Sequence, residues 1–201
     1  MAELPEAERL IDRRTQEVIA GHEQLRTGGL IPRIVQAAGM IVDSYRSGGK
    51  VAAFGNGGSA ADAAHIVGEL VGRFGRDRPP LGAIALTDNA PSLTAISNDY
   101  AFEEAFARQV RAVGTAGDVA VAISTSGNSA NVIAAVAAAR EIGMKTIGLT
   151  GADGGRLARE VDLCLSYPAQ ITPRVQEGHA FIGHMICELV EDELFPPTAP
   201  A

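Results

Sequence analysis

The stretch VAAFGNGGSAADAAHIVGEL, residues 51–70, decides the fold of this chain. It begins with a short β-prone run, passes through a glycine-rich turn and continues as a helical pattern of mostly small residues. Four more β-prone runs follow, most of them leading toward a helical segment: AIAL (83–86), VAVAI (119–123), TIGL (146–149) and LCLSY (163–167). Continuous apolar strands separated by helices predict a doubly wound α/β fold, in which helices flank a mostly parallel five-stranded sheet on both faces.

The two ends of the chain are predicted to be helical. Apolar residues recur at helical spacing across residues 4–48, and TGG at 27–29 breaks the pattern, so we expect two leading helices within residues 1–48. The last helix is expected to run from near Pro173 to about Leu194, with Thr172 as its N-cap. The tail at 196–201 should be frayed, and residues 1–201 should form one domain.

Composition excludes several classes of protein. A hydrophobic content of 46% comes without any apolar run near the roughly 18 residues that span a bilayer, so we expect no membrane segment. The acidic start MAELPEAERLIDRR does not resemble an export signal, which predicts a cytoplasmic location. A net charge of −7 argues against a nucleic-acid partner. Cys164 and Cys187 have no metal-type spacing and are predicted to be reduced, buried thiols.

Two similar loops follow the first and third strands. GNGGSA (55–60) lacks both the lysine of a P-loop and the spacing of a dinucleotide-binding turn. STSGNSA (124–130) places five hydrogen-bonding side chains around one glycine, and Ser129 can also cap the following helix. No Lys or Arg occurs from 51 to 72 or from 112 to 139. We therefore predict that neutral donors and a helix N-terminus bind one monoester phosphate there.

Two helical segments carry candidate catalytic side chains. His65 and Glu69 are four residues apart and share one helix face directly behind the first loop. Gln176 and His184 are separated by two steps of four on the last helix, so both can face one site. A partly shielded carboxylate suits proton removal from carbon, and an imidazole exchanges protons near neutral pH. His22 is expected to be only a surface residue, and His179 to be interfacial or structural.

Four ordered motifs resemble a known family: GNGGSAADAAHIVGEL (55–70), SNDY (97–100), ISTSGNSANV (123–132) and TPRVQEGHAFIGH (172–184). Together they are similar to the sugar isomerase (SIS) family, and within it to the phosphoheptose isomerases. The resemblance implies a homotetramer that converts sedoheptulose 7-phosphate to D-glycero-D-manno-heptose 7-phosphate through an enediol or enediolate. It also implies one labile Zn²⁺ per subunit.

The resemblance implies roles for individual residues. Glu69 and His184 match the catalytic acid/base positions. The matching zinc ligands are His65, Glu69, Gln176 and His184. The implied substrate contacts are Asn56, Gly57, Gly58, Ser59, Glu69, Asn98, Asp99, Ser124, Thr125, Ser126, Ser129 and Gln176, with Ser124 to Ser129 mostly on the phosphate and Asn98 and Asp99 on sugar hydroxyls.

Two other functions remain open from the sequence. A close relative of the family is a non-catalytic SIS module that binds the bacterial replication initiator protein, and a further possibility is another SIS sugar-phosphate isomerase or sensor. Glu69 beside His65 discriminates against the first, because a binding module has no need of a shielded carboxylate there. A panel of sugar phosphates would separate the second.

Overall fold

The computed structural model describes residues 4–196, and its centre is one five-stranded sheet. The strands are β1 (Val51–Gly55), β2 (Ala83–Ala85), β3 (Val119–Ser124), β4 (Lys145–Thr150) and β5 (Leu163–Ser166). They pair in the order β2-β1-β3-β4-β5, and every pair is parallel. The predicted doubly wound sheet is therefore confirmed, and it is parallel throughout rather than mostly parallel.

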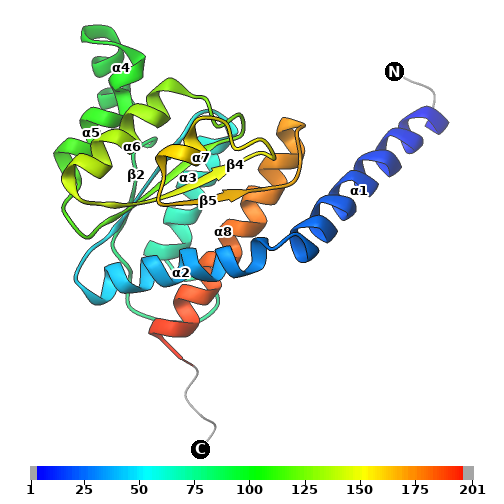
Figure 1. The fold of residues 1–201 in the computed structure, drawn as a ribbon, viewed down its shortest axis with the longest axis horizontal. Helices are drawn as coiled ribbons and strands as arrows, with labels where there is room; N and C mark the ends of the chain where they lie inside the picture. Colours follow the sequence, from blue (N-terminus) through cyan, green and yellow to red (C-terminus); the bar gives the residue numbers. More distant parts are fainter. Residues whose placement is uncertain (1–3, 197–201) are drawn as a thin grey trace, which may run out of the picture.

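Helices cover both faces of the sheet (Figure 1). The elements outside the sheet are α1 (Leu4–Thr27), α2 (Leu30–Arg46), α3 (Gly58–Val71), α4 (Ala90–Asp99), a 3₁₀ turn η1 (Phe102–Glu104), α5 (Ala105–Val113), α6 (Ala130–Ile142), α7 (Leu157–Glu160) and α8 (Thr172–Leu194). One core contains buried side chains of α2, α3 and α8, and the other contains those of α5, α6 and α7.

Strand β3 explains why the two cores can form. All of its residues are buried, and successive side chains point to opposite faces. Val119, Val121 and Ile123 belong to the core with α2, α3 and α8. Ala120 and Ala122 face the other core, where the alanine-rich α6 packs against them. Small residues on both surfaces let α6 lie close to the sheet, which fixes its N-terminus beside the end of β3.

The last helix begins slightly differently from the prediction. α8 starts at Thr172, so its N-cap is Ile171, which makes no capping hydrogen bond through its side chain. The prediction of Thr172 as N-cap is wrong by one residue, a shift within the range of normal boundary uncertainty. The helix ends at Leu194 as expected, and the predicted frayed tail falls mainly outside the described residues.

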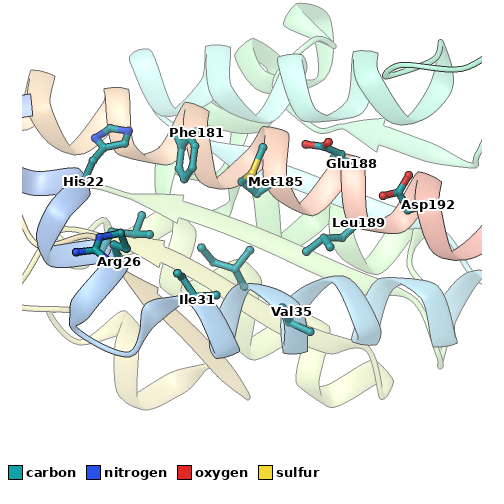
Figure 2. A pocket seen from close by; sticks show the side chains of 11 residues that line it. His22, Arg26, Ile31, Val35, Phe181, Met185, Glu188, Leu189 and Asp192 are labelled. Atoms are coloured by element: carbon teal, nitrogen blue, oxygen red, sulfur yellow. The ribbon is translucent and has the colours of Figure 1, made fainter. Parts of the chain in front are cut away.

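The two predicted leading helices are α1 and α2, with the break at Gly28 and Gly29. Figure 1 shows α1 projecting from the body. Its apolar side chains at Leu10, Ile11 and Ile19 are exposed. Between α1, α2 and α8 lies a groove of about 530 Å³, with His22, Ile31 and Phe181 among its lining residues (Figure 2). These exposed apolar surfaces have no partner within the described part of one chain.

The strand order fixes where a ligand is expected. Strand β2 is added on one side of β1, whereas β3, β4 and β5 are added in turn on the other side. The direction in which strands are added therefore reverses between β1 and β3. In open parallel sheets, ligands bind beyond the carboxyl ends of the strands at this switch point. The loop 55–60 leaves β1 there, and the loop 124–130 leaves β3 there. Among the described helices, none has the length and apolarity of a membrane span.

Candidate active site

The two loops at the switch point are joined directly. The side-chain amide of Asn56 donates to Asn131 Oδ1 at 2.8 Å, and the amide of Asn131 donates back to Asn56 Oδ1 at 2.8 Å. Asn131 is 3% exposed and lies in the first turn of α6. No role was predicted for it from the sequence, although it lies within the motif ISTSGNSANV. This reciprocal pair holds the loop after β1 against the loop after β3.

The loop after β3 is held by its own polar groups. Ser124 is buried, and its Oγ lies 3.0 Å from Ser129 Oγ. Ser129 is the N-cap position of α6 as predicted, but its side chain makes no capping hydrogen bond because it pairs with Ser124. Gly127 has a φ of +64° and is buried against the backbone of Gly154, so a side chain there would be both strained and obstructed.

The arrangement suits an anion. The first backbone N–H groups of a helix have no partner within the helix, and those of α6 point toward the loop that ends at Ser129. Thr125 is half-buried and Ser126 is exposed, so their hydroxyls lie at the surface of the same loop. Gly57 and Gly58 on the other loop are exposed, while Ser59 is buried at the start of α3. The predicted donors of the two loops thus occupy one edge of the sheet.

The second part of the site is a cluster of His65, Glu69 and His184. His65 Nε2 lies 2.7 Å from His184 Nε2 and 3.5 Å from Glu69 Oε1. One ligand atom of each residue lies within 4.8 Å of the others. The Glu69 side chain is 24% exposed and that of His65 is 50% exposed. The predicted shielding of Glu69 is therefore partial, and the cluster is open to a small molecule.

Close packing of α3 on α8 creates this cluster. A Cβ on Gly183 would approach Ile66 Cγ1 to 2.9 Å, so glycine beside His184 lets the two helices meet at that point. Near the start of α3, the end of the Gln176 side chain lies against Gly58, so a larger residue at position 58 would displace it. Gln176 is thus in contact with the glycine-rich loop. It links the loops to the helix that carries His184.

Two further residues lie beside the cluster and were not identified from the sequence. Asp62 precedes His65 by one turn of α3, and burial raises the pKa of its carboxyl to about 6 against the opposing charge of His65. The sequence did contain a signal for Asp62, because a residue three positions before His65 lies beside it on the same helix face. The ring centroid of Phe74 lies 5.8 Å from that of His184. No sequence pattern indicated that contact, because it depends on how the chain turns after α3.

Asn98 and Asp99 lie on α4, which stands apart from the cluster helices α3 and α8 within one chain. Both are exposed at the end of α4, where the Asn98 amide donates to Asp99 Oδ1 at 2.8 Å. No residue of α4 is buried, and Figure 1 shows the helix projecting from the body, apart from α3 and α8. Their predicted contact with sugar hydroxyls therefore has no support from the geometry of a single chain.

The two remaining histidines have structural contacts. His22 is half-buried rather than a simple surface residue, because its Nδ1 lies 3.0 Å from Tyr167 Oη and its ring packs on Phe181. His179 is fully buried, and its Nε2 donates to the Thr150 carbonyl at 3.0 Å. Burial lowers the pKa of His179 to about 4, although this hydrogen bond opposes the shift. Both cysteines are free and buried, as predicted.

The cluster fits a divalent metal ion. Two imidazoles and one carboxylate are the three protein ligands found at many catalytic zinc sites, which leave a further position for water or substrate. His65, Glu69 and His184 supply this donor set, with their ligand atoms within 4.8 Å of one another. Gln176 contacts Gly58 on the neighbouring loop, and its place as a fourth ligand stays a prediction.

Comparison with known proteins identifies the family. The model of the SIS domain family matches residues 18–151, so the chain belongs to that family. The phosphoheptose isomerase of Rhodospirillum rubrum is 54% identical over 170 residues, covering 85% of this chain and 90% of that protein. That of Roseiflexus sp. is 56% identical over 164 residues, covering 82% and 83%.

A solved structure agrees with these relatives. The phosphoheptose isomerase of Neisseria gonorrhoeae superposes with a TM-score of 0.88 at 43% identity, covering 92% of this chain and 99% of that one. Within the SIS domain family, the chain therefore belongs to the phosphoheptose isomerases.

Proposed function

We propose that this protein is an aldose–ketose isomerase that converts sedoheptulose 7-phosphate to D-glycero-D-manno-heptose 7-phosphate through an enediolate. The observation that carries the proposal is the His65–Glu69–His184 cluster, in which His65 and Glu69 stand on α3, the helix that begins in the loop after β1. That loop is joined to the neutral donors of the loop after β3. One part suits the proton transfers of an isomerase, and the other suits a phosphate. The phosphoheptose isomerases that resemble the chain over most of its length support the choice of substrate.

The phosphate is assigned to the loop after β3. Ser124, Thr125, Ser126 and Ser129 offer hydroxyls, and the N-terminus of α6 offers backbone N–H groups. A monoester phosphate needs no lysine when such donors converge on it. Asn56, Gly57, Gly58 and Ser59 on the first loop, together with Gln176, are assigned to the rest of the sugar phosphate chain. These substrate contacts are predictions for a crystal structure with ligand.

The chemistry moves a carbonyl between C2 and C1. Glu69 removes a proton from the carbon beside the carbonyl, which leaves an enediolate, and the proton is then returned to the neighbouring carbon. His184 exchanges a proton with the sugar oxygen, because an imidazole both donates and accepts near neutral pH. Glu69 lies 3.5 Å from His65, so the base is held in place by its neighbour on α3.

We assign one zinc ion per subunit to His65, Glu69, Gln176 and His184. When bound, such an ion polarises a carbonyl and stabilises negative charge on oxygen. The amide oxygen of Gln176 is a weak ligand, so the ion should be labile. Calorimetric titration of the chelator-treated protein with Zn²⁺ tests this assignment. One site per chain is the expected result.

The alternatives have weaker support. A non-catalytic module for the replication initiator protein would have no use for a glutamate 3.5 Å from His65 at an open ligand site. Another SIS sugar-phosphate enzyme or sensor would share the loops. The matching phosphoheptose isomerases are identical to this chain at about half of the aligned positions. They favour the seven-carbon substrate over that option.

We further propose that the protein is a cytoplasmic homotetramer. The exposed apolar residues of α1 and the open groove between α1, α2 and α8 are surfaces that a second copy would cover (Figure 2). Asn98 and Asp99 can reach a sugar only if α4 meets the site of another copy or moves, so their role is assigned to the assembled enzyme. Light scattering at micromolar concentration should give the tetramer mass, and a fully active monomer would refute the assembly.

The function has a direct test. Purified protein is incubated with sedoheptulose 7-phosphate, and NMR is used to detect the aldoheptose phosphate. The expected result is an equilibrium mixture of the two sugars. Fructose 6-phosphate and glucosamine 6-phosphate serve as controls, and turnover of either in preference to the heptulose would contradict the assigned substrate.

A further inference from the structure

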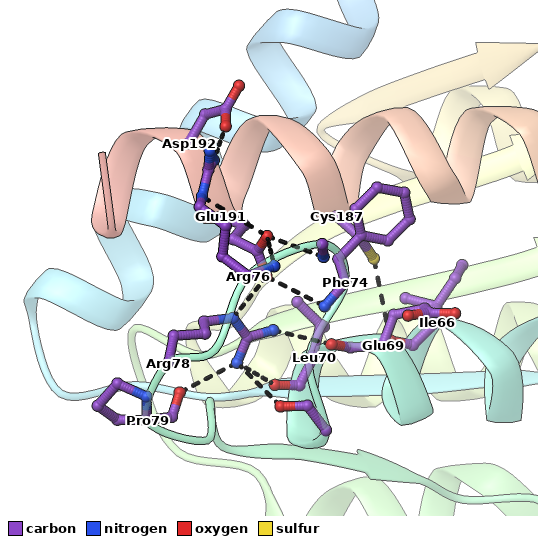
Figure 3. A network of polar contacts seen from close by, with 12 residues as sticks. Ile66, Glu69, Leu70, Phe74, Arg76, Arg78, Pro79, Cys187, Glu191 and Asp192 are labelled. Carbon is purple, nitrogen blue, oxygen red and sulfur yellow. Dashed lines mark hydrogen bonds and ion pairs between the residues drawn. The ribbon is translucent and has the colours of Figure 1, made fainter. Parts of the chain in front are cut away.

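A buried ion pair lies behind the His65–Glu69–His184 cluster. Arg78 Nε donates to Glu191 Oε2 at 3.0 Å, and the two side chains are only 2% and 3% exposed. The same carboxylate accepts backbone N–H groups of Phe74, Gly75 and Arg76 at 2.9 to 3.0 Å. Figure 3 shows Glu191 projecting from α8 into the segment that follows α3. Glu191 therefore holds that segment against α8.

Arg78 continues the connection to α3. Its Nη2 donates to the Glu69 carbonyl at 2.8 Å, and its Nη1 donates to the Leu70 carbonyl at 2.9 Å. Carbonyls in the last turn of a helix have no partner within the helix, and a cation there also suits the helix dipole. The Arg78 guanidinium thus caps the C-terminal end of α3, and one of the two carbonyls that it binds belongs to Glu69.

Both ends of this connection lie close to the cluster. Glu191 is two helical turns beyond His184 on α8, on the same side of the helix. Phe74, whose N–H is bound by Glu191, places its ring 5.8 Å from the ring of His184. One ion pair therefore joins the helix that carries His65 and Glu69 to the helix that carries His184.

We propose that Arg78 and Glu191 are positioning residues, which set the separation between the two α3 side chains and His184. The proposal rests on the isomerase function proposed above. A buried ion pair commonly adds little stability compared with apolar side chains of similar volume. The bonds to the Glu69 carbonyl and to the Phe74 N–H give the pair a geometric role that apolar side chains cannot fill. Loss of a residue that orients metal ligands typically costs 10- to 100-fold in metal affinity or activity.

The chain contains a matched control just before β3. Asp118 precedes β3 and is also buried, and it accepts hydrogen bonds from the backbone N–H and Nζ of Lys50 and from the N–H and hydroxyl of Thr115. Its distances, 2.6 to 2.9 Å, are similar to those of Glu191. Asp118→Asn therefore removes a comparable buried charge without touching α3 or α8.

The experiment compares Glu191→Gln with Asp118→Asn in the full-length protein. Melting temperature, Zn²⁺ affinity by calorimetry, and kcat and KM at saturating zinc are measured for each. Both variants should melt at lower temperature than the wild type. Only Glu191→Gln should bind Zn²⁺ at least about tenfold more weakly and lose kcat by a similar factor, as expected for a residue that orients ligands. Its KM should change less than about threefold, because the phosphate loops are built separately.

Several outcomes decide the proposal. A folded Glu191→Gln with wild-type Zn²⁺ affinity and kcat overturns it, as does an equal loss of both in Asp118→Asn. If Glu191→Gln does not fold, Arg78→Lys is measured instead with the same readouts. This variant keeps the positive charge but loses the paired guanidinium hydrogen bonds to the Glu69 and Leu70 carbonyls. A wild-type protein that does not isomerise the heptulose phosphate would overturn the proposed function alone, because the Zn²⁺ titration still measures the role of the pair.

Discussion

The two halves of the candidate site are built in different ways. The phosphate half consists of two short loops, each contiguous in sequence and held by neutral side chains such as Asn56, Asn131 and Ser124. The catalytic half is assembled from helices whose cluster residues, His65 and His184, are 119 residues apart in the chain. The donors of each loop come from one short run of sequence that follows a strand end, although the Asn56–Asn131 pair joins the two loops. The cluster needs the close packing of α3 on α8, so its geometry depends on the whole fold.

This difference predicts that substrate binding and turnover can be separated by mutation. Changes in the loops should act mainly on KM, because a neutral donor contributes alike to substrate and transition state. Changes in the cluster should act mainly on kcat, because proton transfer occurs only during the reaction. A variant of either half that changed both constants equally would argue against two separate halves.

The largest effect is expected from Glu69→Gln. The amide cannot accept a proton from carbon, so kcat should fall by about 10²- to 10⁴-fold, the usual contribution of a positioned acid or base. KM and the melting temperature should stay close to those of the wild type. Single-turnover rates measured across a zinc titration provide the check.

The zinc titration also separates the two roles of this carboxylate. If Glu69 acts mainly as a metal ligand, added zinc should restore part of the activity of the variant. Near-wild-type turnover of Glu69→Gln at any zinc level would rule out Glu69 as the base. Ser47→Ala is a useful control, because Ser47 is exposed at the C-cap of α2 and lies outside the cluster.

A smaller effect is expected from Ser126→Ala in the phosphate half. Ser126 is exposed in the loop after β3, and a hydrogen bond to a charged group contributes about 1.5–3 kcal/mol. KM should therefore rise about tenfold or more, while kcat stays within about threefold. Initial rates against sugar phosphate concentration measure both constants. Ser47→Ala, at an exposed position after α2, should leave both unchanged.

The same contrast explains what could be predicted from the sequence. Strand positions and loops follow from local patterns, so the five runs and both loops were placed within one or two residues. His65 and Glu69 were paired correctly because one helix turn joins them. Their contact with His184 has no local signal, and its prediction came from the family resemblance.

Other features depend on long-range contacts that no local pattern contains. The Asn56–Asn131 pair and the Arg78–Glu191 pair each join residues from distant parts of the chain. Asn131 appears in sequence as an ordinary first-turn residue of a helix, and Glu191 appears as a solvated acid near the end of α8. Asn98 and Asp99 illustrate the opposite case, because their motif was evident while their position on α4 leaves them apart from the cluster in one chain.

The smallest effect on activity at neutral pH is expected from a substitution of His179, which joins α8 to the end of β4. It lies on α8 between Gln176 and His184, and it donates to the carbonyl of Thr150 at the end of β4. Burial lowers the pKa of His179 to about 4 from its usual value of 6.5. Above pH 6.5 the residue is neutral in both the folded and the unfolded chain. Below it, the unfolded chain binds a proton that the folded chain does not, so the free energy of unfolding should fall as the pH drops toward 4.

The size of this loss follows from the shift in pKa, which corresponds to about 3 kcal/mol by pH 4. Urea unfolding at several pH values between 4 and 7 measures it. His179→Gln keeps a donor for Thr150 but has no titratable group, so its free energy of unfolding should depend less on pH than that of the wild type by about this amount. Equal pH dependence in the two proteins would mean that His179 is protonated in the folded state.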